Sequence, residues 1–219
     1  MSVIIQVFSD YVCPYCYLGD VALRRAAAAT GATVVHRAYQ LRESQQPESG
    51  PPKLEPRGER MNSVWENSIY PMAKGLGAKI HQPSRLPLTR LAHEAAAWAR
   101  QQGRFDQFHR QLFNAFFIED KDFSELSVLK QLAWNAGLNP NELERALTEH
   151  QMAEEVDEDL LIAQTYRISS VPSFVIAGHV LSGIQEEAVL IKAIELARTG
   201  DLAAETRKLP HLPINIARQ

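Results

Sequence analysis

Cys13-Pro14-Tyr15-Cys16 is the stretch on which the prediction of the fold depends. It follows an apolar run, Val3 to Phe8, which is short and rich in β-branched residues and therefore predicts a buried strand. It precedes an Ala-rich segment, Tyr17 to Thr30, that predicts a helix with Pro14 in its first turn, where a missing N–H group costs nothing. Gly31 then stands where helices commonly end in the left-handed conformation. This order places Cys13 at the N-terminus of a helix.

The two cysteines of this stretch predict a redox-active pair. At a helix N-terminus, the N–H groups of the first turn and the positive end of the helix dipole favour a thiolate over a thiol. Cys16 lies one turn after Cys13, close enough for a disulfide. Two alternatives are thiols that only pack in a core and half of a zinc site. Because the sequence has no second CxxC and no closely spaced His pair to complete a zinc site, we expect no metal.

The composition excludes some classes of partner. The chain has 219 residues, 45% of them apolar, and a formal net charge of −3 from 23 basic and 26 acidic side chains. This balance gives no basic surface for nucleic acid or an anionic membrane. No apolar run approaches the roughly 18 residues of a membrane-spanning helix. We therefore expect no nucleic-acid or membrane partner.

The N-terminus and the cysteine content predict a cytoplasmic protein. Met1-Ser2 runs directly into the first predicted strand, without the basic and apolar regions of an export signal. Both cysteines of the chain lie in the motif, which argues against a disulfide scaffold and for a reactive site in a reducing compartment.

The remaining pattern predicts an α/β fold in which strands from both ends of the chain share one mixed sheet. Thr33 to Leu41 predicts a strand parallel to the first, since a helix separates them. Near the C-terminus, residues 173–177 and 179–182 predict an antiparallel hairpin that turns at Gly178, and residues 186–198 a closing helix. The predicted order is β-α-β, several helices, then α-β-β-α.

The middle of the chain predicts an all-helical insertion. Four prolines between Arg42 and Arg60 predict a long exposed loop. Helical patterns follow at 61–76 (weak, and interrupted at Pro71), 88–99, 105–117, 128–136, 140–147 with an N-cap at Asn139, and 152–167. The acidic run from Glu154 to Asp159 predicts a solvated helix face. We therefore predict a domain of residues 1–60 and 151–219, with residues 61–150 as the insertion.

Val171-Pro172 is the second informative site, because it directly precedes the predicted hairpin. A trans proline at the start of an edge strand is one interpretation. The other is a cis bond that leaves the neighbouring backbone exposed to pair with an extended peptide. Proline alone favours trans, since only about 5–6% of X-Pro bonds in folded proteins are cis. The CxxC motif in the same chain reverses this preference.

Four segments together resemble the DsbA-like thioredoxin-fold oxidoreductases, and most closely their FrnE-like branch. The matching segments are Phe8-Ser9-Asp10-Tyr11-Val12-Cys13-Pro14-Tyr15-Cys16-Tyr17-Leu18-Gly19, Leu88-Thr89-Arg90-Leu91-Ala92-His93, Ser170-Val171-Pro172-Ser173-Phe174 and Ser182-Gly183-Ile184-Gln185. The resemblance implies a thioredoxin fold with a helical insertion, a nucleophilic Cys13, a resolving Cys16 and a cis Pro172 beside the disulfide. We expect Val171 and Pro172 to hold the substrate backbone, and Pro14 and Tyr15, on an exposed turn, to contact the substrate.

The resemblance implies a thiol–disulfide oxidoreductase that acts on protein or small-molecule thiols and disulfides. The family that this chain resembles includes glutathione-dependent isomerases and kappa-class transferases. These relatives typically have a serine in place of the nucleophilic cysteine, whereas this chain keeps both cysteines. We expect no tightly bound cofactor, with glutathione as an alternative co-substrate. The alternatives are such an isomerase or transferase on a small aromatic substrate, and a redox-sensing binding module without turnover. The sequence leaves the oligomeric state open.

The residues around the motif predict a redox site less oxidising than that of DsbA. The dipeptide between the cysteines is Pro-Tyr, which adds no positive charge. Asp10 and Asp20 lie nearby in sequence, and negative charge disfavours a thiolate.

Overall fold

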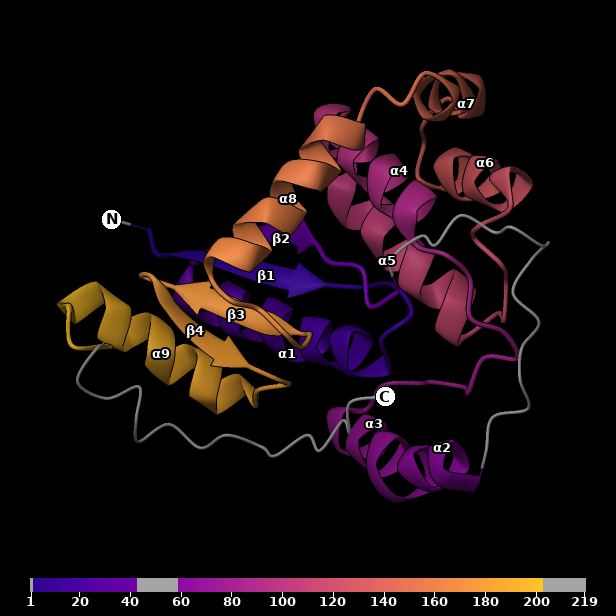
Figure 1. Ribbon diagram of the computed structural model, residues 1–219. Helices are drawn as coiled ribbons and strands as arrows, with labels where there is room; N and C mark the ends of the chain where they lie inside the picture. Colours follow the sequence, from indigo (N-terminus) through magenta and orange to yellow (C-terminus); the bar gives the residue numbers. More distant parts are fainter. Residues whose placement is uncertain (1, 43–58, 203–219) are drawn as a thin grey trace. The chain divides into compact units, whose positions relative to one another are not determined.

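The computed structural model describes residues 2–42 and 59–202 (Figure 1). The chain divides into two compact units, one formed by Met1–Tyr39 with Leu161–Gln219 and the other by Gln40–Leu160. The predicted insertion, residues 61–150, lies inside the second unit, and its limits at 60 and 151 stay a prediction. Within the described ranges, no helix has the length and apolar character needed to cross a membrane.

The first unit contains a four-stranded mixed sheet, as predicted. Its strands are β1 (Ile4–Ser9), β2 (Thr33–Ala38), β3 (Ser173–Ile176) and β4 (His179–Ser182), in the order β2-β1-β3-β4. β1 is parallel to β2 and antiparallel to β3, and β3 is antiparallel to β4. Strands from the two ends of the sequence therefore meet at the centre of the sheet, between β1 and β3.

Helices α1 (Pro14–Thr30) and α9 (Glu187–Thr199) pack against one face of this sheet. The limits of α1 agree with the prediction, and Gly31 ends the helix in the left-handed conformation with φ 68°. The core on this face combines side chains of alternate strand positions with those of the two helices: Ile5, Val7, Ala22, Leu23, Ala26, Phe174, Ile176, Leu181, Leu190, Ala193, Ile194 and Leu202. Alternation along β1 and β3 thus directs one set of apolar side chains towards α1 and α9.

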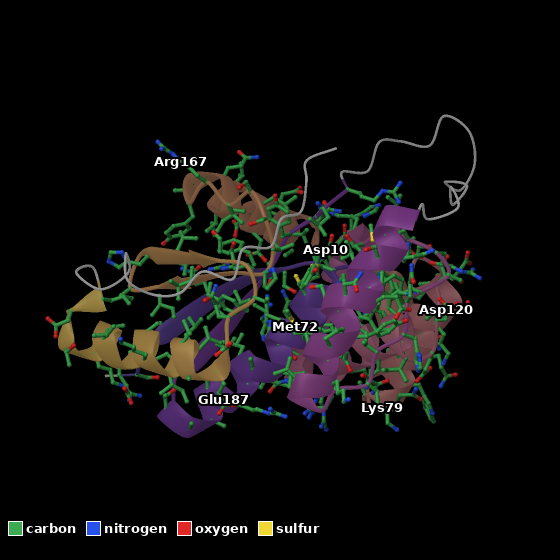
Figure 2. All side chains as sticks on the ribbon, turned by 90° about the horizontal axis from the view of Figure 1, so that it is seen from below. Asp10, Met72, Lys79, Asp120, Arg167 and Glu187 are labelled. Carbon is green, nitrogen blue, oxygen red and sulfur yellow. The ribbon has the colours of Figure 1, made fainter. Side chains whose placement is uncertain are left out.

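The opposite face of the sheet is covered by residues from the end of α8 (Ala153–Thr165) and the turn after it. Phe8, fully buried, follows the inward-facing Val7 of β1 and turns to this side, where its ring centroid is 6.4 Å from that of Tyr166. Figure 2 shows the same layering, with Arg167 and Glu187 on opposite sides of the sheet.

The β3–β4 hairpin turns at Gly178, as predicted, but the turn takes two residues, because Ala177, predicted to end the strand, also lies in it. Ala177 and Gly178 both have positive φ, 47° and 80°, between the paired residues Ile176 and His179. Two successive left-handed residues are typical of the type I′ turn, whose twist matches that of the strands it joins. Glycine tolerates this conformation at no steric cost, whereas Ala177 adopts it under the constraint of the hairpin.

The described part of the second unit is helical. Its elements are α2 (Glu59–Val64), the π-helical turn η1 (Trp65–Ile69), α3 (Tyr70–Leu76), α4 (Arg90–Gln101), α5 (Phe105–Phe117), α6 (Leu126–Asn135), α7 (Pro140–Thr148) and most of α8. An aromatic face of α5 forms part of the core of this unit, since Phe113, Phe116 and Phe117 are at most 1% exposed. Phe116 also contacts Phe123 at a ring-centroid distance of 5.3 Å.

Pro71 does not interrupt the first helical segment of this unit, contrary to the prediction. Instead, η1 widens the helix directly before it, and the Tyr70 N–H group donates to the Trp65 carbonyl, five residues back. Pro71 is the second residue of α3 and follows this wider turn directly, so the change from i−5 to i−4 bonding coincides with the residue that has no N–H group. The predicted loop falls mostly outside the described residues, and Glu59 and Arg60 already belong to α2.

The acidic run of α8 is only in part the solvated face that its composition predicts, since Glu154, Asp157 and Glu158 are exposed. Asp159 is 3% exposed, and two of its neighbours form ion pairs with arginines of α4. Arg90 donates to Asp157 at 2.5 Å and to Glu94 of its own helix at 2.6 Å, and Arg100 pairs with Glu155. These acidic side chains therefore join α8 to α4, a contact between distant segments that charge counting along the sequence does not reveal.

Candidate active site

The motif occupies the first turn of α1. Cys13 is the N-cap residue, with φ −90° and ψ 114°, and Pro14 begins the helix. The backbone N–H of Cys13 donates to the Asp10 carbonyl at 3.1 Å, and the Cys13 carbonyl accepts from Cys16 at 3.0 Å. These bonds fix the turn that joins β1 to α1. No cap hydrogen bond is formed by the Cys13 side chain.

The loop before β3 comes to the same place. The Cys13 thiol donates to the Val171 carbonyl, with 3.6 Å between Sγ and O. The bond between Val171 and Pro172 is cis, the isomer that the resemblance implies. Two sites predicted from opposite ends of the chain thus lie in contact, because β1 and β3 are neighbours in the sheet.

The site is more enclosed than predicted. Cys13 and Cys16 are each 2% exposed, and Tyr15 is 7% exposed rather than on an exposed turn. The physical reason is that the first turn of α1 is part of the core packing and not a projecting loop, so an aromatic ring there is stabilised by burial. Of the four motif residues, Pro14 alone is only half-buried.

Burial raises the pKa of the Cys16 thiol well above its ordinary value, because a thiolate there would lose its hydration. The neighbouring Cys13 acts in the same direction. The Asp10 backbone N–H and the Ser9 hydroxyl act in the opposite direction, because both donate to the Cys16 sulfur. Cys16 is therefore held as a neutral thiol, with two donors in place for the charge that forms when it reacts.

Two acidic side chains lie close to the motif in sequence and are buried. Asp10, in the loop between β1 and α1, is fully buried, and Asp20 is 6% exposed (Figure 2). The Asp20 carboxylate pairs with Arg24 at 2.8 Å and lies 4.0 Å from Nε2 of His36. Arg24 therefore offsets part of the negative charge that the sequence places near the cysteines. The lower oxidising power expected from these two residues stays a prediction.

Several residues that hold the site together lie in the segments that carry the family resemblance, but the sequence alone assigned them no role. Ser173 Oγ donates to the Ser170 carbonyl at 2.7 Å and fixes the loop around Pro172. The Gly183 N–H donates to the Pro172 carbonyl at 2.8 Å. The signal available for Ser173 was its position, as a polar residue inside an apolar strand pattern. A polar side chain that is buried in a strand is usually hydrogen-bonded.

Comparison with known proteins identifies the family of this chain. The model of the DSBA-like thioredoxin domain matches residues 4–195. The chain belongs to this family. The family match spans both units, so the helical segments are part of the domain that defines it.

Individual relatives support the same assignment. An uncharacterized protein of Bacillus subtilis, YwbO, is 33% identical over 198 residues, which cover 89% of this chain and 96% of that protein. A probable DsbA oxidoreductase from Streptomyces coelicolor has a TM-score of 0.78 at 24% identity, over 90% of each chain. A 2-hydroxychromene-2-carboxylate isomerase has a TM-score of 0.71 at 18% identity, covering 94% of this chain and 99% of the isomerase. These structural likenesses establish the thioredoxin fold predicted from the motifs, and they join oxidoreductases and an isomerase in one architecture.

Proposed function

We propose that this DsbA-like protein is a thiol–disulfide oxidoreductase in which Cys13 is the nucleophile and Cys16 the resolving thiol. The observation that carries the proposal is the position of Cys13, at the N-cap of α1 with its sulfur 3.6 Å from the Val171 carbonyl. Negative charge is favoured at a helix N-terminus, where reactive cysteines are commonly found. We infer that an extended peptide pairs with the backbone of Val171, which is 1% exposed in the free protein, and so brings a substrate disulfide to that sulfur.

The proposed reaction takes place in two exchanges. The Cys13 thiolate attacks one sulfur of the substrate disulfide, the bond between the substrate sulfurs breaks, and the first substrate thiol leaves with a proton. Cys16 then loses its proton and attacks Sγ of Cys13, and the second substrate sulfur leaves as a thiolate that takes up a proton. The substrate gains two electrons and the Cys13–Cys16 pair loses two. Two equivalents of a small thiol, such as glutathione, restore the Cys13–Cys16 dithiol. With a substrate dithiol and the oxidised pair, the two exchanges run in reverse.

The neutral, buried Cys16 determines the order of the two exchanges. Because its pKa is raised by burial, Cys16 stays protonated while Cys13 reacts. It becomes the attacking group only once the mixed disulfide stands beside it. The Ser9 hydroxyl and the Asp10 N–H then stabilise the charge that appears on its sulfur. This arrangement favours attack on an external disulfide by Cys13 alone.

Replacement of each cysteine tests the proposal. Cys13→Ser should abolish reduction of insulin and of glutathione-linked disulfides, whereas Cys16→Ser should accumulate a mixed disulfide at Cys13 that can be captured from a cell extract. In the folded, reduced protein, iodoacetamide should label Cys13 and spare Cys16. Equal residual turnover in the two serine variants would overturn the proposal, as would labelling that occurs only after unfolding.

The same variants separate the alternatives. A glutathione-dependent isomerase or transferase would bind glutathione and keep its activity in Cys16→Ser. A redox-sensing module would oxidise and reduce reversibly without turnover of any disulfide substrate. The cysteine at position 13 favours disulfide exchange over the isomerase or transferase, and turnover of a disulfide substrate separates it from the redox-sensing module.

We also place the protein in the FrnE-like branch and in the cytoplasm. The branch is supported by the motif sequence from Phe8 to Gly19, and the compartment by the restriction of cysteines to Cys13 and Cys16. Fractionation of cells that produce the native protein tests the second point, since recovery from an exported fraction would contradict it.

A further inference from the structure

Gly19 lies inside α1, on the side that faces the loop carrying Pro172. A Cβ atom at this position would stand 3.2 Å from Cγ of Pro172, 3.7 Å from Cγ1 of Ile184 and 3.8 Å from Cζ of Phe174. The backbone at Gly19 is helical and needs no glycine. Glycine inside a helix costs about 0.5–1 kcal/mol relative to alanine, so the close approach of the proline ring is the physical reason for it.

On the sides that do not face Gly19, hydrogen bonds limit how far the Pro172 loop can move away from α1. The Gly183 N–H donates to the Pro172 carbonyl at 2.8 Å, and the side chain of Gln185, 3% exposed, donates in turn to the Gly183 carbonyl at 3.2 Å. Ser173 Oγ binds the Ser170 carbonyl at 2.7 Å. The proline ring is therefore held between these bonds and the bare backbone of α1.

The same helix carries Cys13, six residues before Gly19, and the Cys13 sulfur contacts the Val171 carbonyl at 3.6 Å. The distance between α1 and the Pro172 ring therefore determines where the Val171 backbone stands relative to the sulfur. Resting on the function proposed above, we propose that Gly19 is a positioning residue for peptide substrates. Its missing Cβ lets Pro172 approach α1 and so aligns the Val171 backbone, which binds the substrate chain, with the Cys13 sulfur.

Gly19→Ala tests this role with two substrates of different size. The added methyl group would require Pro172 to move by a few tenths of an ångström. We expect kcat/KM for a disulfide within an extended peptide to fall by about 3- to 10-fold, mainly through KM, because small displacements misalign a bound substrate. The rate with hydroxyethyl disulfide, which is too small to use the Val171 backbone, should stay within twofold of wild type by the same reasoning.

Gly75→Ala is the matched control, because Gly75 is an exposed residue of α3 and nothing lies within 4 Å of a Cβ there. It should leave both rates unchanged and shift the urea midpoint of unfolding slightly upward, because alanine is a better helix former than glycine. Ile184→Val keeps the Cγ1 carbon that lies 3.7 Å from a Cβ at Gly19 but removes one methyl group from the packing around it, and it is expected to fold, since the change is small. It should produce the same peptide-selective rise in KM, to a smaller extent.

The outcomes separate this inference from the function on which it rests. Wild-type protein that reduces neither substrate, or that does so without Cys13, would contradict the proposed function whatever Gly19 does. Active wild-type protein combined with a Gly19→Ala variant that changes both rates equally, or neither, would overturn the positioning role alone. If Gly19→Ala does not fold, Ile184→Val decides the question, and equal effects on the two substrates would overturn the role.

Discussion

Two helices of this protein begin with nearly the same backbone but different side chains. The N-cap residue is Cys13 for α1, with φ −90° and ψ 114°, and Asn139 for α7, with φ −80° and ψ 114°. A proline follows each of them. The third helical residue is Cys16 in α1 and Glu142 in α7. The two cysteines of the motif therefore occupy the positions that form a conventional cap in α7.

The cap of α7 is hydrogen-bonded and exposed. Asn139 Oδ1 accepts from the Asn141 N–H at 3.0 Å, and Asn139 Nδ2 donates to the Glu142 carboxylate at 3.2 Å. The side chains at the N-cap and third positions thus reach each other in this backbone conformation, as a disulfide between Cys13 and Cys16 requires. In α1 the same positions are buried and the Cys13 side chain forms no cap bond. The comparison indicates that α1 lacks a stabilising side-chain cap because its N-cap position carries the Cys13 sulfur.

The largest expected effect comes from restoring an oxygen at the N-cap of α1. In Cys13→Ser, we expect disulfide exchange to fall by about a thousandfold or more, as when other enzymes lose their nucleophile. The hydroxyl can accept from the first turn of the helix and donate to the Val171 carbonyl. The free energy of unfolding should therefore rise by about 0.5–1 kcal/mol relative to the reduced wild type. Urea unfolding and insulin reduction measure the two changes.

Cys13→Ala is the control for this first prediction, since it removes the sulfur without supplying an oxygen. It should be as inactive as the serine variant but no more stable than wild type. Equal stability of the serine and alanine variants would contradict the view that α1 lacks a cap for the sake of its thiol.

The second expected effect is a dependence of the free energy of unfolding on pH that arises mainly from Cys16, which is buried in the first turn of α1. Burial raises the pKa of Cys16 above the 9.0 of an ordinary thiol, so as the pH increases the unfolded chain loses this proton first. The stabilisation is fully present below about pH 9 and is lost as the pH rises through the pKa of the folded state. The free energy of unfolding of the reduced protein should fall by up to about 1.4 kcal/mol per pH unit in this interval.

Urea unfolding between pH 8 and 10 measures this slope, and Cys16→Ser should remove most of it. Tyr17, whose pKa burial also raises above the ordinary 10.0, contributes in the same direction at still higher pH and is unchanged in the variant. The same slope in Cys16→Ser and in wild type would contradict the assignment to Cys16.

The start of each helix was predictable because its signals are local. Pro14 and Gly31 predicted α1 correctly, and Asn139-Pro140 with Glu142 predicted the cap of α7. The element order was also predictable from local patterns. Apolar strand patterns occur near both ends of the chain, and these strands must share one sheet to bury their faces.

Features that depend on distant segments were not predictable in this way. The burial of Tyr15 depends on how the first turn of α1 packs, and sequence reasoning expected it to be exposed. The ion pair of Arg90 with Asp157 joins helices 67 residues apart, so the acidic run of α8 looked solvated. Gly19 could have been noticed as an isolated glycine in a helix, but its neighbour Pro172 is known only from the fold.

The smallest expected effect comes from removing the cap of α7. Asn139→Ala should lower the free energy of unfolding by about 1 kcal/mol, because the Asn141 N–H loses its acceptor. Disulfide exchange should be unchanged, since this cap serves stability alone. Asn141→Ala is the control: it keeps the backbone N–H that Asn139 binds and should cost at most about 0.5 kcal/mol. Equal losses in the two variants would show that Asn139 is no more than a surface residue. The resemblance between the two helix starts would then lie in the backbone only.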